Sequence, residues 1–276
     1  MAITVKTNMA AAGALNALNK TSRALAGSFE RISSGLRISK AADDAAGLGV
    51  AENLRAAYRS ADVAARNIND GNSIIGIAEG AAGEVGDILV RMRELAVQSA
   101  SETLDDDERV YVQDEFTQLT DEVDRIAGTT EFNGLKLTDG TLSTIAVQVG
   151  INNTSNDQIT ITLGDLSAST LGVDAGSVDL STSSGASSAL TNIDAAIASL
   201  SSYRSSFGSV QNRLGSALNT LETFSETTKG AESAIRDADF GYETAQLSQN
   251  QILQQAGVSI LSQAKTLNQS AQQLLQ

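Results

Sequence analysis

Three clusters of carboxylate or amide side chains are the places where this 276-residue chain could carry out chemistry. They lie at residues 43–44, 69–72 and 105–108. The chain contains no Cys and no His. It can therefore form no disulfide, and it lacks the commonest general base and the commonest transition-metal ligand. Any catalysis or metal binding would have to rest on oxygen ligands.

The spacing within each cluster favours a structural role. Asp43 and Asp44 have no third ligand nearby, and Asp is a common cap at the start of a helix. Residues 69–72 lack the twelve-residue spacing and the final Glu of a calcium loop, so they predict a kink or a short turn. The consecutive acids at residues 105–108 splay around a helix and stabilise its first turn. We therefore predict no catalytic residue, no metal site and no cofactor.

A hydrolase with paired carboxylates is the enzymatic alternative. It would need two acids that converge from different elements in an apolar cleft. No such pair is recognisable in the sequence, so we expect a protein that is not an enzyme.

The pattern that organises the chain lies in residues 9–36, where apolar residues recur in alternating steps of three and four. This heptad spacing places a stripe along one side of a helix. A single helix of this length is marginal in water, so the stripe needs a partner surface. The stripe consists of Leu15, Leu18, Ser22, Leu25, Phe29, Ile32 and Leu36.

A comparable stripe at the C-terminal end offers that partner. One extra step of four interrupts its heptads, which slackens the winding of a coiled coil locally. We expect the two ends of the chain to pack together and to form a seam for self-assembly. The C-terminal stripe consists of Leu253, Ala256, Ile260, Ala264, Leu267, Ala271 and Leu274.

Four further helical stretches are predicted between the ends, and the first covers residues 50–69. Residues 103–128 begin with a cap and an acidic turn, and they end at Gly128. Residues 190–221 form a third long helix of about 50 Å, and Gly230 is expected to break the chain before the terminal helix. The most regular stripe consists of Ile75, Ala78, Ala82, Val85, Leu89, Met92, Ala96 and Ser99.

The period changes to two after Gly128, as is typical of strands. Asn-Gly at 133–134 and Asp-Gly at 139–140 are turn dipeptides. Residues 145–149 and 158–163 alternate apolar and polar side chains, so we expect one or two β-hairpins. Residues 167–188 are rich in Ser, Thr, Gly and Asp, which is typical of a surface segment.

These patterns predict a mainly α fold, a long antiparallel helical bundle or coiled coil with a small β-hairpin region at one end. We expect an inner coiled-coil domain of paired termini, an outer helical domain with the hairpins, and a short variable polar link. The bounds of these parts are 1–42 plus 235–276, 43–165 plus 190–234, and 166–189.

The formal net charge of −14 is unevenly distributed. Residues 1–40 hold six basic residues and one acid, so the excess of negative charge lies in the middle of the chain. An acidic middle argues against nucleic acid as a partner. No run of about 18 apolar residues predicts a membrane span. The first residues lack the basic and apolar regions of a cleaved secretory signal.

Five motifs resemble those of the bacterial flagellins. They follow the order of the family and span roughly residues 1–140 and 190–276. The motifs are SSGLRISKAADDAAGL (33–48), NDG (69–71), RMRELAVQS (91–99), FNG (132–134) and QILQQAG (251–257). The resemblance implies a secreted, extracellular subunit of the bacterial flagellum that self-polymerises into the filament used for swimming motility. Residues 164–189 replace the large outer domains of longer flagellins.

The resemblance also implies partners. These are further copies in a helical homopolymer, the filament cap and hook-junction proteins, and an export chaperone on the C-terminal segment, with export through the flagellar type III channel. No nucleic acid and no membrane are expected as partners. A flagellar hook–filament junction protein is the alternative, but it should diverge at residues 91–99 and 251–257.

A second face of the helix at residues 75–99 is the predicted subunit contact. Arg91, Leu95 and Gln98 lie at steps of four and three beside the core stripe. Leu95 either widens that stripe or is exposed for contact with another subunit. The matching residues of flagellins, with Glu115 on the next helix, are recognised by Toll-like receptor 5. The resemblance therefore implies innate immune recognition at this patch.

Hydroxyl side chains in the polar loops are candidate glycosylation sites. They are Thr154, Ser155, Ser167, Ser169 and Thr170.

Overall fold

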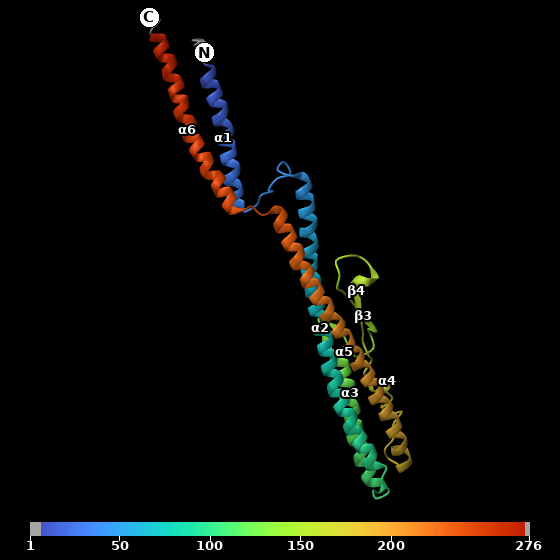
Figure 1. Ribbon diagram of the computed structural model, residues 1–276. Coiled ribbons are helices and arrows are strands. Elements are labelled where there is room, and N and C mark those ends of the chain that lie inside the picture. Colours follow the sequence, from blue (N-terminus) through green and yellow to red (C-terminus); the bar gives the residue numbers. More distant parts are fainter. Residues whose placement is uncertain (1–6, 274–276) are drawn as a thin grey trace. The chain divides into compact units, whose positions relative to one another are not determined.

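The computed structural model describes the backbone of residues 7–273 and side-chain burial for residues 7–266. Long helices that pack antiparallel dominate it, with short strands between them (Figure 1). The predicted mainly α fold with β-hairpins is therefore confirmed. The elements are α1 (Met9–Ser34), α2 (Ala45–Ser99), α3 (Asp106–Thr129), β1 (Glu131–Phe132), β2 (Leu135–Lys136), β3 (Thr144–Gln148), the short 3-10 helix η1 (Ser155–Asp157), β4 (Gln158–Thr162), α4 (Ala168–Leu171), α5 (Ser183–Arg236) and α6 (Phe240–Gln273).

The chain divides into two compact units. The terminal unit lies within residues 1–57 and 226–276, and it contains α1 and α6. The bundle unit consists of residues 58–225. Most of α2 and most of α5 belong to the bundle unit, together with α3, α4 and the strands.

Helix α2 runs without interruption through residues 69–72, so the predicted kink or turn is wrong. The reason is packing against the hairpin. Gly71 is buried, and a Cβ atom at this position would lie 3.1 Å from the side chain of Val147 on β3. The glycine therefore allows a strand to approach the helix closely, and this packing outweighs the turn preference of Asn-Asp-Gly.

Helix α5 also continues through a predicted break, at Gly230. The chain leaves the helix only after Arg236, and α6 begins at Phe240. The Oδ1 atom of Asp239 accepts a hydrogen bond from the backbone N–H of Tyr242, 3.1 Å away. Asp239 therefore caps α6. An Asp just before a helix is a common cap, and this residue marks the boundary that Gly230 does not.

The start of α3 confirms the predicted cap. The side chain of Asp105 accepts a hydrogen bond of 2.8 Å from the backbone N–H of Glu108. The side chain of Glu108 in turn accepts one from the backbone N–H of Asp105. This reciprocal capping box satisfies two free donors at the start of the helix.

The core of the bundle unit forms between α2, α3 and α5. All eight residues of the predicted α2 stripe are buried. Helix α5 runs antiparallel to α2, as ion pairs and hydrogen bonds between the two helices show. These join Asp62 to Ser225 at 2.7 Å, Glu79 to Arg204 at 2.8 Å, and Arg93 to Asp194 at 2.7 Å.

The strands that the structure describes pair into two antiparallel hairpins. The first pairs β1 with β2 across the Asn133-Gly134 turn, where both residues have a positive φ. The second pairs β3 with β4, with Val147 opposite Ile159. Val147, Ile159 and Ile161 join the same apolar cluster as parts of α2 and α5. The hairpins predicted from the change in period are therefore confirmed.

Residues 166–189 are more than a polar link, and that part of the prediction is wrong. The segment contributes buried apolar side chains to the core formed by α2 and α3. The backbone N–H of Leu180 donates a 2.6 Å hydrogen bond to the side chain of Gln113, and Ser99 donates one of 2.5 Å to the carbonyl of Leu180. The many Ser, Thr and Gly residues of this segment conceal eight buried apolar positions, of which Ala189 is the last. The others are Leu166, Ala168, Leu171, Val173, Val178, Leu180 and Ala186.

Candidate functional site

Helices α1 and α6 pack side by side in the terminal unit (Figure 1). The predicted packing of the two chain ends is confirmed. Seven positions on α1 and seven on the described part of α6 are buried or half-buried and recur in heptad steps. On α1 they are Ala11, Ala14, Leu18, Thr21, Leu25, Ser28 and Ile32, and on α6 they are Glu243, Leu247, Asn250, Gln254, Gly257, Leu261 and Ala264.

The residues of this seam differ in part from the predicted ones. Leu18, Leu25 and Ile32 are half-buried, as is Leu36 just beyond α1. Six predicted residues, Ser22 among them, face solvent instead, so their predicted place between α1 and α6 is wrong. The other five are Leu15 (48% exposed), Phe29 (66%), Leu253 (49%), Ala256 and Ile260 (56%). The side chains of Leu267 and Ala271 and all of Leu274 lie outside the described residues.

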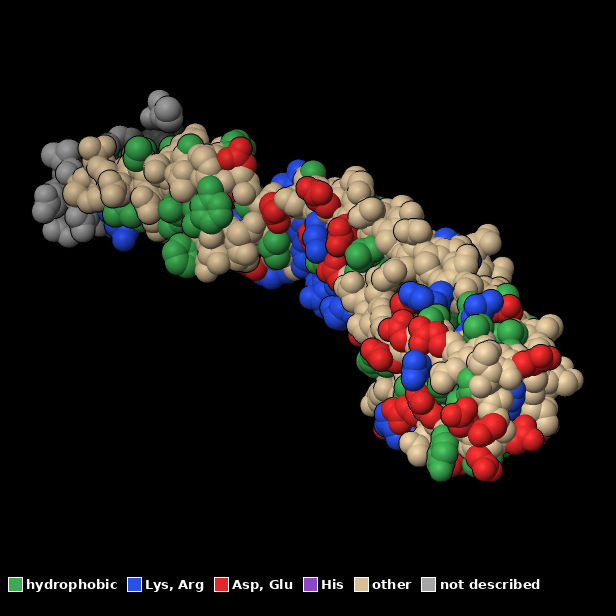
Figure 2. All heavy atoms as spheres, turned by 90° about the horizontal axis from the view of Figure 1, so that it is seen from below, with side chains coloured by type: hydrophobic (Ala, Val, Ile, Leu, Met, Phe, Trp, Pro, Cys, Tyr) green, Lys and Arg blue, Asp and Glu red, His purple; other side chains and the backbone are tan. Residues whose placement is uncertain are grey.

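The physical reason is that each terminal helix carries two stripes with heptad spacing. One consists largely of small and polar residues, which let the two helix backbones approach closely. At Gly257 a Cβ atom would lie 3.3 Å from Leu18. The other stripe carries the large apolar side chains, and in the terminal unit it remains uncovered. In Figure 2, hydrophobic side chains (green) stand out on these helices.

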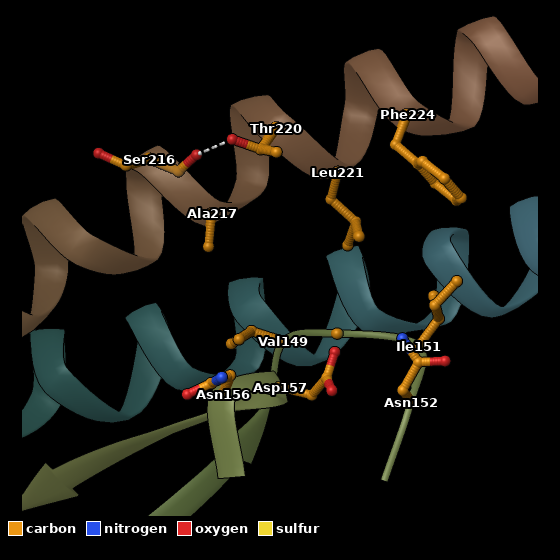
Figure 3. A pocket seen from close by; sticks show the side chains of 11 residues that line it. Val149, Ile151, Asn152, Asn156, Asp157, Ser216, Ala217, Thr220, Leu221 and Phe224 are labelled. Carbon is orange, nitrogen blue, oxygen red and sulfur yellow. Dashed lines mark hydrogen bonds between the residues drawn. The ribbon is translucent and has the colours of Figure 1, made fainter. Parts of the chain in front are cut away.

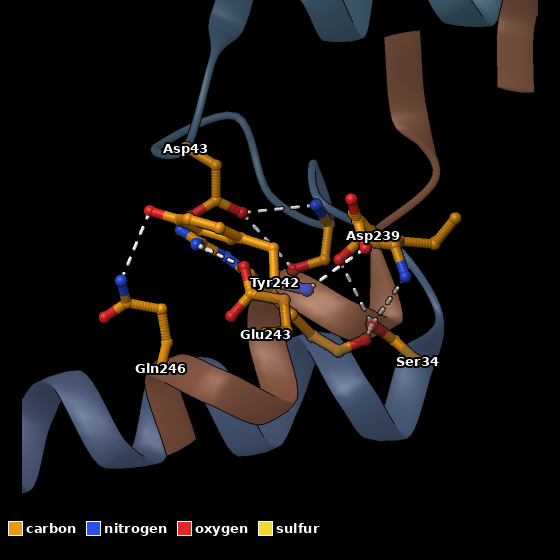
Figure 4. A network of polar contacts seen from close by, with 9 residues as sticks. Ser34, Asp43, Asp239, Tyr242, Glu243 and Gln246 are labelled. Carbon is orange, nitrogen blue, oxygen red and sulfur yellow. Dashed lines mark hydrogen bonds and ion pairs between the residues drawn. The ribbon is translucent and has the colours of Figure 1, made fainter. Parts of the chain in front are cut away.

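A polar junction joins the C-terminal end of α1 to the start of α6 (Figure 4). Arg31 and Glu243 form an ion pair at 3.1 Å, and the side chain of Glu243 is 5% exposed. The backbone N–H of Arg37 donates to the carbonyl of Arg236 at 2.7 Å. Backbone hydrogen bonds from Lys40 and Ser39 lower the pKa of the Asp43 carboxyl. Asp43 therefore stabilises the loop that follows α1.

The second predicted patch lies in the bundle unit, where α2 faces α3. Arg91 donates to Glu115 at 2.7 Å and to Glu94 at 2.9 Å. The hydrogen bond to Glu115 raises the pKa of the Arg91 guanidinium, which is exposed to solvent. Gln98 is also exposed. The structure thus brings Arg91, Gln98 and Glu115 together on one surface.

Leu95 belongs to the core, because only 1% of it is exposed. The alternative in which Leu95 widens the core stripe is therefore the correct one. Helix α2 packs against two other helices and so needs a stripe wider than one heptad seam. Leu95 still forms part of the floor of a surface hollow of about 410 Å³. The hollow is also lined by Gln98, Leu104, Glu108, Tyr111, Val112 and Glu115.

The candidate glycosylation residues occupy two loops. Thr154 and Ser155 are exposed in the loop between β3 and β4. The side chain of Ser167 caps α4, since it accepts from the backbone N–H of Thr170. The hydroxyl of Thr170 donates to Asp165 at 2.6 Å. Modification of Thr154, Ser167, Ser169 or Thr170 would therefore disturb a hydrogen bond of the hydroxyl group, and Ser155 is exposed.

Neither surface resembles a catalytic centre. Among residues 7–273, no group of three His, Cys, Asp or Glu side chains lies close enough together to hold a metal ion. In the same part of the chain, no helix is long and apolar enough to cross a membrane. Both surfaces consist of exposed side chains on long helices, an arrangement suited to binding other protein surfaces.

Comparison with known protein families gives two matches. Residues 5–143 match the bacterial flagellin N-terminal helical region, and residues 190–275 match the bacterial flagellin C-terminal helical region.

Individual relatives agree with these matches. A flagellin of Halalkalibacterium halodurans is 43% identical over 247 residues, which cover 90% of each chain. The crystal structure of Bacillus cereus flagellin is similar with a TM-score of 0.50 and 34% identity, over 56% of this chain and 88% of that one. A putative flagellar hook-associated protein from Vibrio parahaemolyticus has a TM-score of 0.58 at 14% identity, over 71% of this chain and all of that one. The last likeness is one of fold alone.

Proposed function

The chain belongs to the bacterial flagellin family, and we infer from this membership that it is a structural subunit of the flagellar filament. Copies of the chain polymerise into the filament that drives swimming. The observation that carries this function is the match of both ends of the chain to the flagellin helical regions, together with a relative similar over nine-tenths of both chains. The hook–filament junction alternative has no comparable support, because its likeness is limited to the fold.

The terminal helices offer a physical reason for polymerisation. Leu253 and Ile260 on α6 lie seven residues apart on one face of the helix and are 49% and 56% exposed. An uncovered stripe of this kind on a long helix is costly in water and favours association with another apolar surface. We propose that copies of the chain cover the stripes of α1 and α6, including Leu15, Phe29, Leu253 and Ile260.

The remaining partners are proposals that rest on the family. They are the filament cap, the hook-junction proteins and an export chaperone on the C-terminal segment. Export of the chain to the extracellular flagellum is a further proposal on the same ground. The proposal that the chain is not an enzyme is supported by the structural role of the family and by the lack of a recognisable catalytic constellation.

Recognition by Toll-like receptor 5 is proposed for the surface formed by Arg91, Gln98 and Glu115. The ion pair between Arg91 and Glu115 holds two charged groups on adjacent helices in a fixed arrangement. Replacing Arg91 with Ala should reduce activation in a receptor reporter assay on monomeric protein. Replacing Arg125, which pairs with Glu122 elsewhere on α3, is the matched control. Full activation with Arg91→Ala would contradict receptor recognition at this surface.

Two experiments test the filament function itself. Purified protein should form filaments visible by electron microscopy after seeding or addition of a precipitating salt. Expression of the chain in a motile bacterium that lacks its own flagellin should restore filaments and swimming. A chain that restores only short hook-proximal structures would instead support the junction alternative.

A further inference from the structure

A second hollow, of about 500 Å³, lies between α5 and the loop that joins β3 to β4 (Figure 3). Its apolar lining includes Val149, Ile151, Ala217, Leu221 and Phe224, with Thr220 at one edge. Ile151 is 37% exposed and Phe224 is 39% exposed. The hollow has the size and apolar character of a site that accepts a large side chain.

The most exposed aromatic side chain of the bundle unit is Tyr111 on α3, with 74% of its surface accessible. It projects from an acidic surface, because Asp107, Glu108 and Asp114 lie one helical turn before or after it and are exposed. A side chain of this kind is a common anchor of protein interfaces, since its ring buries much apolar area and its hydroxyl can remain hydrated.

The hollow and Tyr111 lie at opposite ends of the bundle unit. The pairing of Arg91 with Glu115 places Tyr111 beside the stretch of α2 near residue 95. The hydrogen bond of Asp62 to Ser225 places Thr220 beside the stretch near residue 67. At 1.5 Å per helical residue, the two positions are about 42 Å apart along the unit. Contact between them within one chain is therefore impossible, whereas contact between two copies is possible.

Charge favours the same pairing. Arg213 is exposed and precedes Ala217, Thr220 and Phe224 by four, seven and eleven residues, so it lies on the face of α5 that borders the hollow. Asp157 also lines the hollow, and its carboxylate accepts a hydrogen bond from the Thr154 hydroxyl. The acidic surroundings of Tyr111 thus complement a basic residue beside the hollow.

We propose that Tyr111 of one copy inserts into the hollow beside Thr220 and Phe224 of the next copy, so that bundle units stack head to tail. The proposal rests on the filament function and names the surfaces that meet. Such a contact joins two different surfaces of the same chain, and contacts of this type repeat without limit and generate filaments. Arg213 of the accepting copy then lies near Asp107 and Asp114 of the inserting copy.

Disulfide trapping tests the contact directly, because the natural chain has no Cys. The variant that combines Tyr111→Cys with Thr220→Cys is polymerised and then oxidised. A disulfide requires Cα atoms within about 7 Å, so one chain cannot close it on itself. We expect a ladder of covalent multimers from filaments and none from dilute monomer.

Two controls make the result specific. Tyr111→Cys alone should give no ladder. Val97→Cys combined with Thr220→Cys should also give none, although Val97 is 51% exposed. Filaments of the double variant that yield no ladder would overturn the proposal and leave the filament function intact. Failure of the unsubstituted chain to polymerise would instead contradict the filament function.

A second measurement covers the case in which the double variant does not assemble. Tyr111→Ala should raise the critical concentration for polymerisation at least tenfold, whereas Tyr111→Phe should change it little. An unchanged critical concentration for Tyr111→Ala would overturn the proposal. If Phe224→Ala weakens assembly and Tyr111→Ala does not, another part of the second copy fills the hollow and the proposal is equally wrong.

Discussion

Arg109 is a buried cation whose three hydrogen bonds all go to backbone carbonyl groups. Only 4% of the residue is exposed. Its guanidinium donates to the carbonyls of Ser99, Ser101 and Leu104 at 3.2, 2.8 and 3.1 Å. These carbonyls belong to the end of α2 and the turn before α3, where no backbone N–H of a following helical turn is available as a donor. One side chain therefore supplies hydrogen-bond donors to three carbonyl groups at the junction of α2 and α3.

Replacing Arg109 with Leu should destabilise the bundle unit. The three carbonyls would lose their donors, at a cost of about 2–4 kcal/mol in the free energy of unfolding. Lys should not restore the loss, because an ammonium group cannot reproduce the planar set of donors. Urea unfolding of the monomer measures the effect. Arg125→Leu, which removes an exposed Arg, is the control and should have little effect; equal stability of the two variants would contradict this role of Arg109.

Replacing Leu95 with Ala should also act on stability. The side chain is packed in the core, so its truncation leaves a cavity and costs about 2–5 kcal/mol in the free energy of unfolding. Val97→Ala removes methyl groups from a residue on the same helix that is 51% exposed, and it should cost much less. Chemical unfolding of both variants decides the point. A Leu95→Ala protein as stable as the natural one would mean that this residue is a surface contact after all.

At the scale of elements, the sequence predicts the bundle unit well because its helices carry single, strongly apolar stripes. Every residue of the α2 stripe, from Ile75 to Ser99, is buried. Prediction failed where a local signal competed with packing. The Asn-Asp-Gly of α2 favours a turn locally, yet the packing of the buried Gly71 against Val147 keeps the stretch helical. Gly230 of α5 is exposed, and a single glycine lowers the stability of a helix without having to end it.

The seam of the terminal helices was harder to predict for a different reason. Leu15 and Phe29 on α1 have the heptad spacing of a seam, and so do the small residues Ala14, Thr21 and Ser28. Spacing alone cannot distinguish the stripe that pairs α1 with α6 from a stripe left for other copies. The spacing of Leu15 and Phe29 therefore predicts a place between α1 and α6 that small and polar residues occupy instead.

The exposed stripe of α6 gives a test at this scale. Ile260→Asp places a charge where the proposed contact between copies would bury it without a partner, which is costly. Polymerisation should fail, whereas the fold of the bundle unit should be unchanged in circular dichroism and thermal unfolding. Ile260→Val is the matched control and should polymerise. Normal filaments of the Ile260→Asp variant would show that this stripe remains exposed to solvent in the filament.

At the scale of the whole molecule, the two units differ in what they bury. The bundle unit has two apolar clusters whose largest fully buried side chains include Phe116, Phe207 and Met92. In α1, and in α6 up to residue 266, the buried residues are all polar, namely Ser28, Glu243 and Asn250. The bundle unit therefore has the means to fold alone, and the terminal helices depend on apolar surface from elsewhere.

The last prediction follows from this difference. Ordering the backbone costs about 1–2 kcal/mol per residue, and the half-buried seam between α1 and α6 offers little apolar burial to offset that cost. We therefore expect α1 and α6 to be largely unfolded in the free monomer and to become helical on polymerisation. Amide hydrogen exchange should show fast exchange in residues 9–34 and 240–273 of the monomer and protection in filaments. Residues 75–99 should be protected in both states and serve as the internal control. Strong protection of residues 253–273 in a verified monomer would mean that the seam of one chain is sufficient and that folding of the ends is independent of assembly.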